Sequence, residues 1–295
     1  MRAAVAERGV ARIVPSVAAS DGAGVKLRRS LGSAPSLRVD PFLMLDEFGT
    51  DNPDDYIAGF PPHPHRGFET VTYMIDGHMQ HRDHLGNVGD LGPGGVQWMC
   101  AGRGVIHSEM PRQSEGRMRG FQLWINLPAA EKMKPASYRD IPAADIPIAA
   151  LPGGGQVKVI AGAIQIADRR VEGPINGLAA KLSTDPLYLD LELPPGGEFT
   201  QPLPAGHAAF LYPYEGDATV RTATGARAVP LQAAAVLDAA GGVVTCIAGP
   251  RGLRALLLAA QPIGEPVVQH GPFVMNTREE IERAIADYQA ARLTA

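Results

Sequence analysis

Residues 63–65 of this chain read His-Pro-His, and residues 107–109 read His-Ser-Glu. In an extended strand, side chains two residues apart point to the same face of the sheet. The two histidines of the first stretch therefore form one pair, and the histidine and glutamate of the second form another. Opposed residues on paired strands have Cβ atoms roughly 5 Å apart, so two such strands can place all four side chains around one ion. The two stretches predict one metal site.

The predicted ligands are His63, His65, His107 and Glu109. Three imidazoles and one carboxylate favour iron, manganese, nickel, copper or zinc over magnesium or calcium, because imidazole is a borderline ligand and carboxylate is a hard one. Pro64 cannot donate to a strand ladder, so we expect the first pair at a strand start or a sheet edge, near the mouth of a barrel. The alternative is four scattered polar residues, each satisfied by hydrogen bonds or solvent.

The rest of the chain indicates an all-β protein with two domains. At 295 residues and 45% hydrophobic content, it is long enough for two packed cores. Its 34 glycines and 26 prolines divide it into short β-rich runs, such as residues 70–75, 121–125 and 187–193. Prolines and a triple glycine interrupt residues 127–155, which we interpret as the interdomain connection. We place the domains at residues 1–140 and 141–295.

One helix is predicted near the end of the chain. Thr277 and Glu280 have the spacing of a capping box. Apolar residues then recur at helical spacing, which predicts a face that packs onto a barrel. These residues are Ile281, Ala284, Ile285 and Tyr288.

Composition limits the partners. A net charge of −4 and a pI near 6.1, without a cluster of basic residues, argue against direct binding of nucleic acid. The chain lacks a signal-peptide pattern and an apolar stretch of about 18 residues, so we expect a cytoplasmic protein with no membrane partner. Cys100 and Cys246 are expected to be core thiols.

Five stretches of the sequence resemble the pirin family of two-barrel cupins. The resemblance spans nearly the whole chain, and the two stretches that hold the predicted ligands are its most specific part. The five stretches are residues 40–42 (DPF), 45–48 (LDEF), 63–73 (HPHRGFETVTY), 97–111 (QWMCAGRGVIHSEMP) and 271–277 (GPFVMNT).

The resemblance implies two tandem cupin (jelly-roll) β-barrels with a C-terminal α-helix. It also implies one iron ion, Fe²⁺, in the N-terminal barrel, held by the residues that match the family's ligands: His63, His65, His107 and Glu109. Nickel, zinc, manganese or copper could take the site according to availability. Several pirins open the central ring of the flavonol quercetin with O₂, and some act as transcriptional cofactors.

These two activities give the main hypotheses. The first is a quercetin 2,3-dioxygenase, in which Glu109 also acts as the base that takes the 3-hydroxyl proton, and a depside leaves with carbon monoxide. The second is a metal- and redox-dependent regulator that acts through a protein partner in transcription or metabolism. A third, weaker hypothesis is a cupin that binds a sugar or small acid and keeps the metal for structure.

Some residues leave alternatives open. The general cupin pattern has a metal-binding glutamate a few residues after its histidine pair, so Glu69 competes with Glu109; we favour Glu109 because it shares a strand face with His107. A second polar cluster lies near a predicted hairpin turn at Gly86 and Asn87, and a solvated hairpin is favoured over a second metal site. Its members are His78, His81, Asp83 and His84, of which His81 or Asp83 could line the pocket entrance.

The second half of the chain has no histidine pair at the place where a cupin would carry its ligands. Residues 197–204 read GEFTQPLP there, and His207 and His270 are isolated. We therefore predict a C-terminal barrel without metal.

Overall fold

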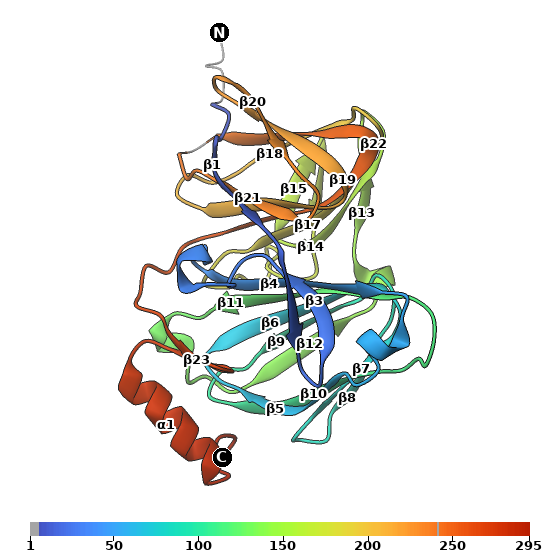
Figure 1. Ribbon diagram of the computed structural model, residues 1–295. Coiled ribbons are helices and arrows are strands. Elements are labelled where there is room, and N and C mark those ends of the chain that lie inside the picture. The colour runs from blue at the N-terminus through green and yellow to red at the C-terminus, as the bar shows by residue number, and fades with distance from the viewer. Residues whose placement is uncertain (1–5, 241) are drawn as a thin grey trace. The chain divides into compact units, whose positions relative to one another are not determined.

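The computed structural model describes residues 6–240 and 242–295 (Figure 1). Within these ranges the chain is mostly β-strand and forms two compact units. Residues 17–38, 42–144 and 263–295 form one unit, which we call the first barrel; residues 6–16, 39–41 and 145–262 form the other, the second barrel. No helix of the described residues is long and apolar enough to cross a membrane.

The first barrel is built around two antiparallel sheets, beside the short C-terminal hairpin described below. Its larger sheet has the strand order β12-β9-β6-β11-β4-β3-β2, and its smaller sheet has the order β5-β10-β7-β8. The larger sheet comprises β2 (Val17–Asp21), β3 (Val25–Arg29), β4 (Phe42–Thr50), β6 (Phe68–Asp76), β9 (Val96–Cys100), β11 (Met118–Asn126) and β12 (Ser137–Ile141). The smaller sheet comprises β5 (Phe60–His65), β7 (Met79–Asp83), β8 (Val88–Leu91) and β10 (Val105–Pro111).

The central strands of the larger sheet are buried on both faces. Every residue of β6 from Phe68 to Met74 is buried, which explains why the run reads as continuously apolar or uncharged apart from Glu69. The hairpin between β7 and β8 turns where the sequence predicts. There the side chain of Asp83 accepts hydrogen bonds from the backbone N–H of Leu85 and Asn87.

The second barrel is built around a larger antiparallel sheet with the order β1-β21-β19-β22-β17-β14-β13. Two strands pair beside this path, β18 with β22 and β20 with β19, and β15 pairs with β16. These strands are β1 (Val10–Pro15), β13 (Ile148–Ala150), β14 (Gln156–Ala161), β15 (Ala163–Ile166), β16 (Arg169–Glu172), β17 (Leu187–Leu193), β18 (Glu198–Pro202), β19 (Ala208–Thr222), β20 (Gly225–Val229), β21 (Ala233–Leu237) and β22 (Val243–Ala260).

The one α-helix of the described chain is α1 (Arg278–Gln289), as predicted. Thr277 accepts a hydrogen bond from the Glu280 N–H, and the Glu280 carboxylate accepts one from the Thr277 N–H, so the capping box is complete. Ile281 and Ala284 are buried in a cluster with Phe273 of the short hairpin β23 (Val268–His270) and β24 (Phe273–Met275). The apolar face of the helix thus packs as expected, although Tyr288 stays 41% exposed.

The C-terminal segment is tied to the first barrel by buried cations. Arg66 follows the histidine pair directly; its guanidinium is 2.9 Å from an Asp287 carboxylate oxygen and donates to the Leu293 carbonyl at 3.1 Å. The Lys132 ammonium donates to the carbonyls of Gly67 at 2.7 Å and Val274 at 3.1 Å. Such groups are costly to bury unless every donor finds an acceptor, so they hold α1 and the adjacent hairpin in place.

Grouping by contact assigns segments from both ends of the chain to each unit. The chain changes unit at residues 144–145, β1 groups with the second barrel and α1 groups with the first. The division into domains at residues 1–140 and 141–295 stays a prediction. The predicted connection also contains short strands, because β12 pairs with β9 and β13 pairs with β14. Pairing partners far away in the sequence decide these placements, and local proline and glycine content does not reveal them.

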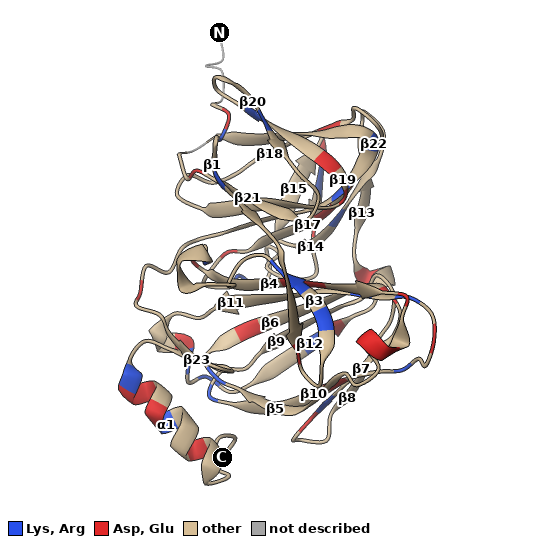
Figure 2. Ribbon diagram, viewed as in Figure 1, with Lys and Arg blue, Asp and Glu red and all other residues tan. Residues whose placement is uncertain are grey.

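Acidic and basic residues are mixed along both barrels, as Figure 2 shows. Basic residues gather on β3, where the Lys26 ammonium lies 2.6 Å from a carboxylate oxygen of Asp55. Arg29 of the same strand pairs with the buried Asp46 at 2.6 Å. These cations are therefore matched by carboxylates within their own barrel.

Candidate metal centre

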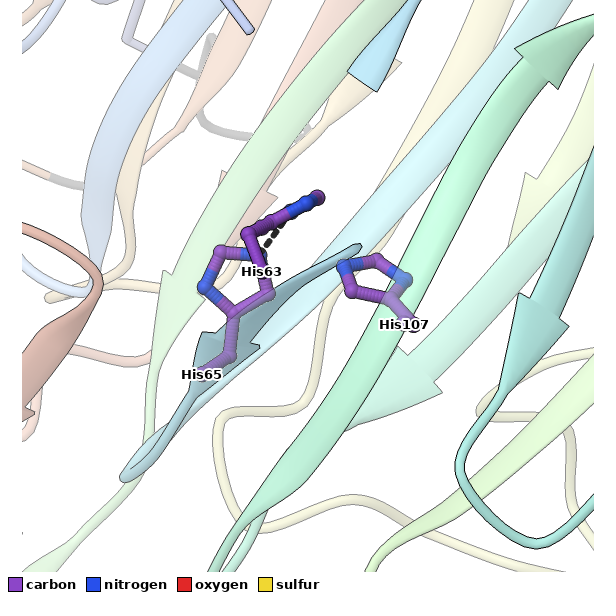
Figure 3. Close-up of side chains that lie close together, drawn as sticks. All are labelled: His63, His65 and His107. Carbon is purple, nitrogen blue, oxygen red and sulfur yellow. Dashed lines mark hydrogen bonds between the residues drawn. The ribbon is translucent and has the colours of Figure 1, made fainter. Parts of the chain in front are cut away.

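The predicted ligands lie on β5 and β10 of the smaller sheet in the first barrel. β5 is the edge strand and pairs with β10 alone, which confirms the edge position expected from Pro64. In the antiparallel register, His63 lies opposite His107, and His65 lies opposite Val105. Directly opposed residues share a sheet face, so the three histidines point to one side (Figure 3).

The three imidazoles converge. One ring nitrogen from each of His63, His65 and His107 lies within 4.8 Å of the others. The Nε2 atoms of His63 and His65 are 3.0 Å apart, and the ring centroid of His107 is 4.4 Å from that of His63 and 4.9 Å from that of His65. The structure thus brings these three side chains together, and their role as metal ligands stays a prediction.

In two of the rings, Nδ1 contacts a group outside the cluster of three histidines. Nδ1 of His63 is 2.8 Å from the Pro61 carbonyl oxygen, and Nδ1 of His107 is 3.2 Å from Nδ1 of His81. The Nε2 atom of His107 is buried and has no hydrogen-bond partner among the described residues. In Figure 3 this inner side of the ring faces His63 and His65.

Burial keeps the imidazoles of His65 and His107 neutral. Desolvation lowers the pKa of His65 well below its usual value, and the nearby His63 acts in the same direction. Desolvation also lowers the pKa of His107, with further contributions from His65, His63 and His81. A neutral imidazole offers a lone pair, which is the form that binds a metal ion.

The cluster fits a transition-metal ion. Two nitrogen ligands that are each about 2.0–2.1 Å from one metal, at a right angle, lie roughly 3 Å apart, which matches the spacing between the Nε2 atoms of His63 and His65. A cation would also satisfy the buried Nε2 atom of His107, which otherwise loses its interaction with water without replacement.

Glu109 lies at the same cavity but outside the group of three. Its side chain is buried, and one carboxylate oxygen is 2.9 Å from the Thr72 hydroxyl. The register of β10 against β5 shifts between His107 and Glu109. The extra residue lies on β5, so His107 and Glu109 still share a face of β10, as their unshifted pairing with β7 shows; the bulge changes how β5 lies against Glu109. The role of Glu109 as fourth ligand therefore remains a prediction.

Glu69 lies on the other face of the larger sheet. On β6, Thr72 faces the cavity, so Glu69 points away from it by strand alternation. One of its carboxylate oxygens accepts a hydrogen bond from Trp98 Nε1 at 3.2 Å, and desolvation raises the pKa of Glu69 to about 7. The structure thus does not bring Glu69 to the histidines.

The second polar cluster does not form one site. His81 is buried against His107, whereas Asp83 caps the hairpin turn. His78 and His84 are exposed. β7 covers Met79–Asp83 only, so His78 and His84 lie outside the strand, and His81 is the member of the cluster that reaches the histidines.

A cavity of about 780 Å³ adjoins the histidines. It is lined by His63, His65 and Glu109, by the polar residues Thr72 and Gln122, and by apolar and aromatic side chains. Across it, Arg29 forms two hydrogen bonds with Asp46, at 2.7 and 2.6 Å, which raise the pKa of the guanidinium. The apolar and aromatic lining includes Met44, Phe48, Phe60, Met79 and Trp124.

Sequence reasoning missed the cavity residues outside the two ligand stretches. Thr72, Gln122 and Trp124 lie on strands of the larger sheet, opposite one another in pairs: Thr72 faces Gln122, and Thr70 faces Trp124. One signal in the sequence could have found them. Thr70 and Thr72 are polar residues at alternate positions of an otherwise apolar strand, and this alternation indicates a strand face that points toward a polar interior.

The interior of the second barrel is different. Phe199 of β18 and Leu203 belong to one large cluster of buried apolar side chains. His207 lies 3.4 Å from a carboxylate oxygen of Asp185, and His270 of the first barrel is exposed. Cys100 and Cys246 are both buried and free, as predicted, and burial raises their pKa to about 11 and about 12.

Two tandem β-barrels, one of which gathers histidines from facing strands around a cavity, define a bicupin. Sequence comparison agrees: residues 24–125 match the pirin family model, and residues 188–294 match the model of the pirin C-terminal cupin domain. The chain belongs to the pirin family.

Close relatives cover almost the whole chain. A Pseudomonas aeruginosa protein named "Putative quercetin 2,3-dioxygenase" is 53% identical over 92% of this chain and 93% of its own length. Human pirin is 40% identical over 92% of this chain and 89% of its own length. The crystal structure of a quercetin 2,3-dioxygenase from Acinetobacter baumannii has a TM-score of 0.86 at 32% identity, covering 98% of this chain and 99% of that one.

Proposed function

We propose that this protein is a metal-dependent dioxygenase of the pirin type, which opens the central ring of quercetin-like flavonols with O₂. The observation that carries the proposal is the convergence of three imidazoles, two of them buried and neutral, beside a ligand-sized cavity. Relatives named as quercetin 2,3-dioxygenases, one known from sequence and one from its crystal structure, support the substrate class.

His63, His65 and His107 would hold the ion, and Glu109 is the proposed fourth ligand. An iron(II) ion bound there supplies the redox chemistry that lets O₂ react with an electron-rich ring. Glu109 would complete the ligand set by turning from its hydrogen bond with Thr72. Nickel, zinc, manganese or copper can also occupy such a ligand set. The proposal names iron as the native metal.

The chain's own residues would bind the flavonol and take its proton. The apolar wall of Phe60, Met79 and Trp124 suits a flat aromatic ligand and limits the access of water to the reacting ring. When it is not bound to the ion, the Glu109 carboxylate is the proposed base for the 3-hydroxyl proton, and its hydrogen bond with the Thr72 hydroxyl would then orient it. Overall, one flavonol and one O₂ give one depside and one carbon monoxide.

Metal analysis coupled to turnover tests this proposal. Purified protein would be stripped of metal, reloaded with Fe²⁺ and assayed with quercetin in air and without oxygen. We expect loss of quercetin and release of carbon monoxide only with both metal and O₂. Equal turnover by the stripped protein would contradict the proposal. A loaded protein that does not turn over flavonols would favour the regulatory hypothesis, in which the metal's oxidation state controls a protein partner.

A further inference from the structure

A fourth histidine lies directly behind the cluster. His81 of β7 is 2% exposed, and its Nδ1 atom is 3.2 Å from Nδ1 of His107. β7 pairs with β10 so that His81 lies opposite Glu109 and Asp83 lies opposite His107. His81 therefore shares the inner face of this sheet with both residues.

The direction of this hydrogen bond decides what His107 can do. Two ring nitrogens can bond only if one carries hydrogen and the other offers a lone pair, and a neutral imidazole has one N–H. If Nδ1 of His107 donates, its Nε2 keeps a lone pair and can bind an ion. If His81 donates instead, Nε2 of His107 carries the hydrogen and cannot bind.

The surroundings favour donation by His107. The carboxylates of Glu109, Asp140 and Asp83 all act electrostatically on His81, so a hydrogen on its other nitrogen lies in a negative potential. The Nε2 atoms of His107 and His81 are both buried without a hydrogen-bond partner among the described residues, so burial alone does not decide the direction. An ion among the three histidines would occupy the lone pair of His107 Nε2, and the hydrogen of this ring would then stand on Nδ1, facing His81.

We propose that His81 is a positioning residue for the metal centre: it accepts the Nδ1–H of His107 and so fixes the tautomer whose Nε2 atom faces His63 and His65. The Pro61 carbonyl does the same for His63, whose Nδ1 atom lies 2.8 Å from it. The inference rests on the proposed metal site and not on flavonol turnover. Outer partners of this kind fix ring orientation and typically change metal affinity by 10–100-fold.

Three variants separate this role from packing. His81→Phe keeps an aromatic ring but has no acceptor, and His81→Asn keeps a side-chain acceptor close to the backbone. His78→Ala removes an exposed histidine from the start of the same hairpin and serves as the control. Circular dichroism of each variant verifies the fold.

The first readout is the tautomer of His107 in metal-free protein, from long-range ¹H–¹⁵N spectra of the imidazoles. We expect hydrogen on Nδ1 and a lone pair on Nε2 in the wild type, and loss of this preference in His81→Phe. Hydrogen on Nε2 in the wild type would overturn the proposal. This measurement needs neither metal nor substrate. The wild-type result tests the proposal even if a variant fails to fold.

The second readout is affinity for Ni²⁺, measured by competition with a chelator. We expect roughly 10–100-fold weaker binding by His81→Phe, substantial recovery in His81→Asn, and no change in His78→Ala. Wild-type affinity in a folded His81→Phe would overturn the proposal. A wild type that fails to take up any metal would instead contradict the metal centre itself, and wild-type binding without turnover would contradict only the proposed dioxygenase.

Discussion

The two barrels are built from similar antiparallel sheets but turn different side chains inward. In the first barrel, β5 and β10 direct His63, His65 and His107 toward a cavity. In the second, residues such as Phe199 and Leu211 close the interior with apolar contacts. Architecture therefore does not decide chemistry; the inward-facing residues of a few strands do. Buried polar groups need partners. The polar side chains of the site therefore replace apolar packing in the interior of the first barrel, whereas the interior of the second barrel is filled with apolar side chains.

The largest effect should come from removing one imidazole of the cluster. His65→Ala takes away a buried ring whose Nε2 atom faces that of His63. We expect metal affinity to fall by more than the roughly 10–100-fold typical of an outer partner, with loss of any flavonol turnover. Metal content after dialysis, measured by mass spectrometry, checks this.

His207→Ala is the matched control from the second barrel, because His207 pairs with Asp185 and lies outside the cluster. It should leave metal content unchanged. If His65→Ala retained its metal while His207→Ala lost it, the contrast between the barrels would be reversed.

A large cavity in the second barrel should cost stability but not metal. Phe199→Ala removes a side chain that is 4% exposed within the apolar cluster. Such substitutions typically lower the free energy of unfolding by about 3–5 kcal/mol. Denaturant unfolding and metal content, measured together, check the prediction. Phe199→Leu keeps most of the volume and should cost under about 1.5 kcal/mol; equal losses for both variants would mean that Phe199 is not in a packed core.

The buried carboxyl of Glu69 should make stability depend on pH. Desolvation raises its pKa from the ordinary value of 4.5 to about 7. The unfolded state therefore ionises first as pH rises, so the contribution of Glu69 to stability is full below about pH 4.5 and is lost as pH approaches 7. At about 1.4 kcal/mol for each pH unit, the loss is on the order of 3–4 kcal/mol.

Glu69→Gln should remove this dependence. Relative to the wild type, the variant should become more stable as pH rises from 5 to 8, and its metal content should not change. Urea unfolding at both pH values measures the difference. If the difference in stability between the variant and the wild type were constant across that range, Glu69 would be ionised in the folded protein. If the variant lost its metal, Glu69 would be a candidate ligand again.

The smallest effect concerns the helix cap. Thr277→Ala removes the side-chain oxygen that accepts the Glu280 N–H and should lower stability by about 1 kcal/mol. Hydrogen exchange should show faster opening of α1 and of the hairpin β23–β24, because these elements pack together. Thr277→Ser keeps the acceptor and should behave like the wild type. Increased exchange confined to the second barrel would contradict the grouping of α1 with the first.

The spacing of residues in the sequence predicted the features that depend on a few neighbouring residues. The paired stretches at 63–65 and 107–109, the helix cap at Thr277 and the turn near Asn87 all depend on residues a few positions apart. The resemblance to pirins added the two-barrel architecture, which the comparisons confirm.

Long-range pairing was not predictable in the same way. His81 reaches His107 only because β7 pairs with β10, and Thr72 reaches Glu109 only across the cavity between two sheets. The positions of β1 and α1 depend likewise on partners more than 200 residues away in sequence, as the pairing of Val14 with Ala234 illustrates. Turn signals and periodicity carry no information about such partners.

Anomalous diffraction from crystals of metal-loaded protein, recorded on both sides of the metal's absorption edge, tests the central claim most directly. The account predicts one strong peak per chain, within bonding distance of the Nε2 atoms of His63, His65 and His107. A peak elsewhere, or a loaded protein with no peak among these three rings, would contradict it.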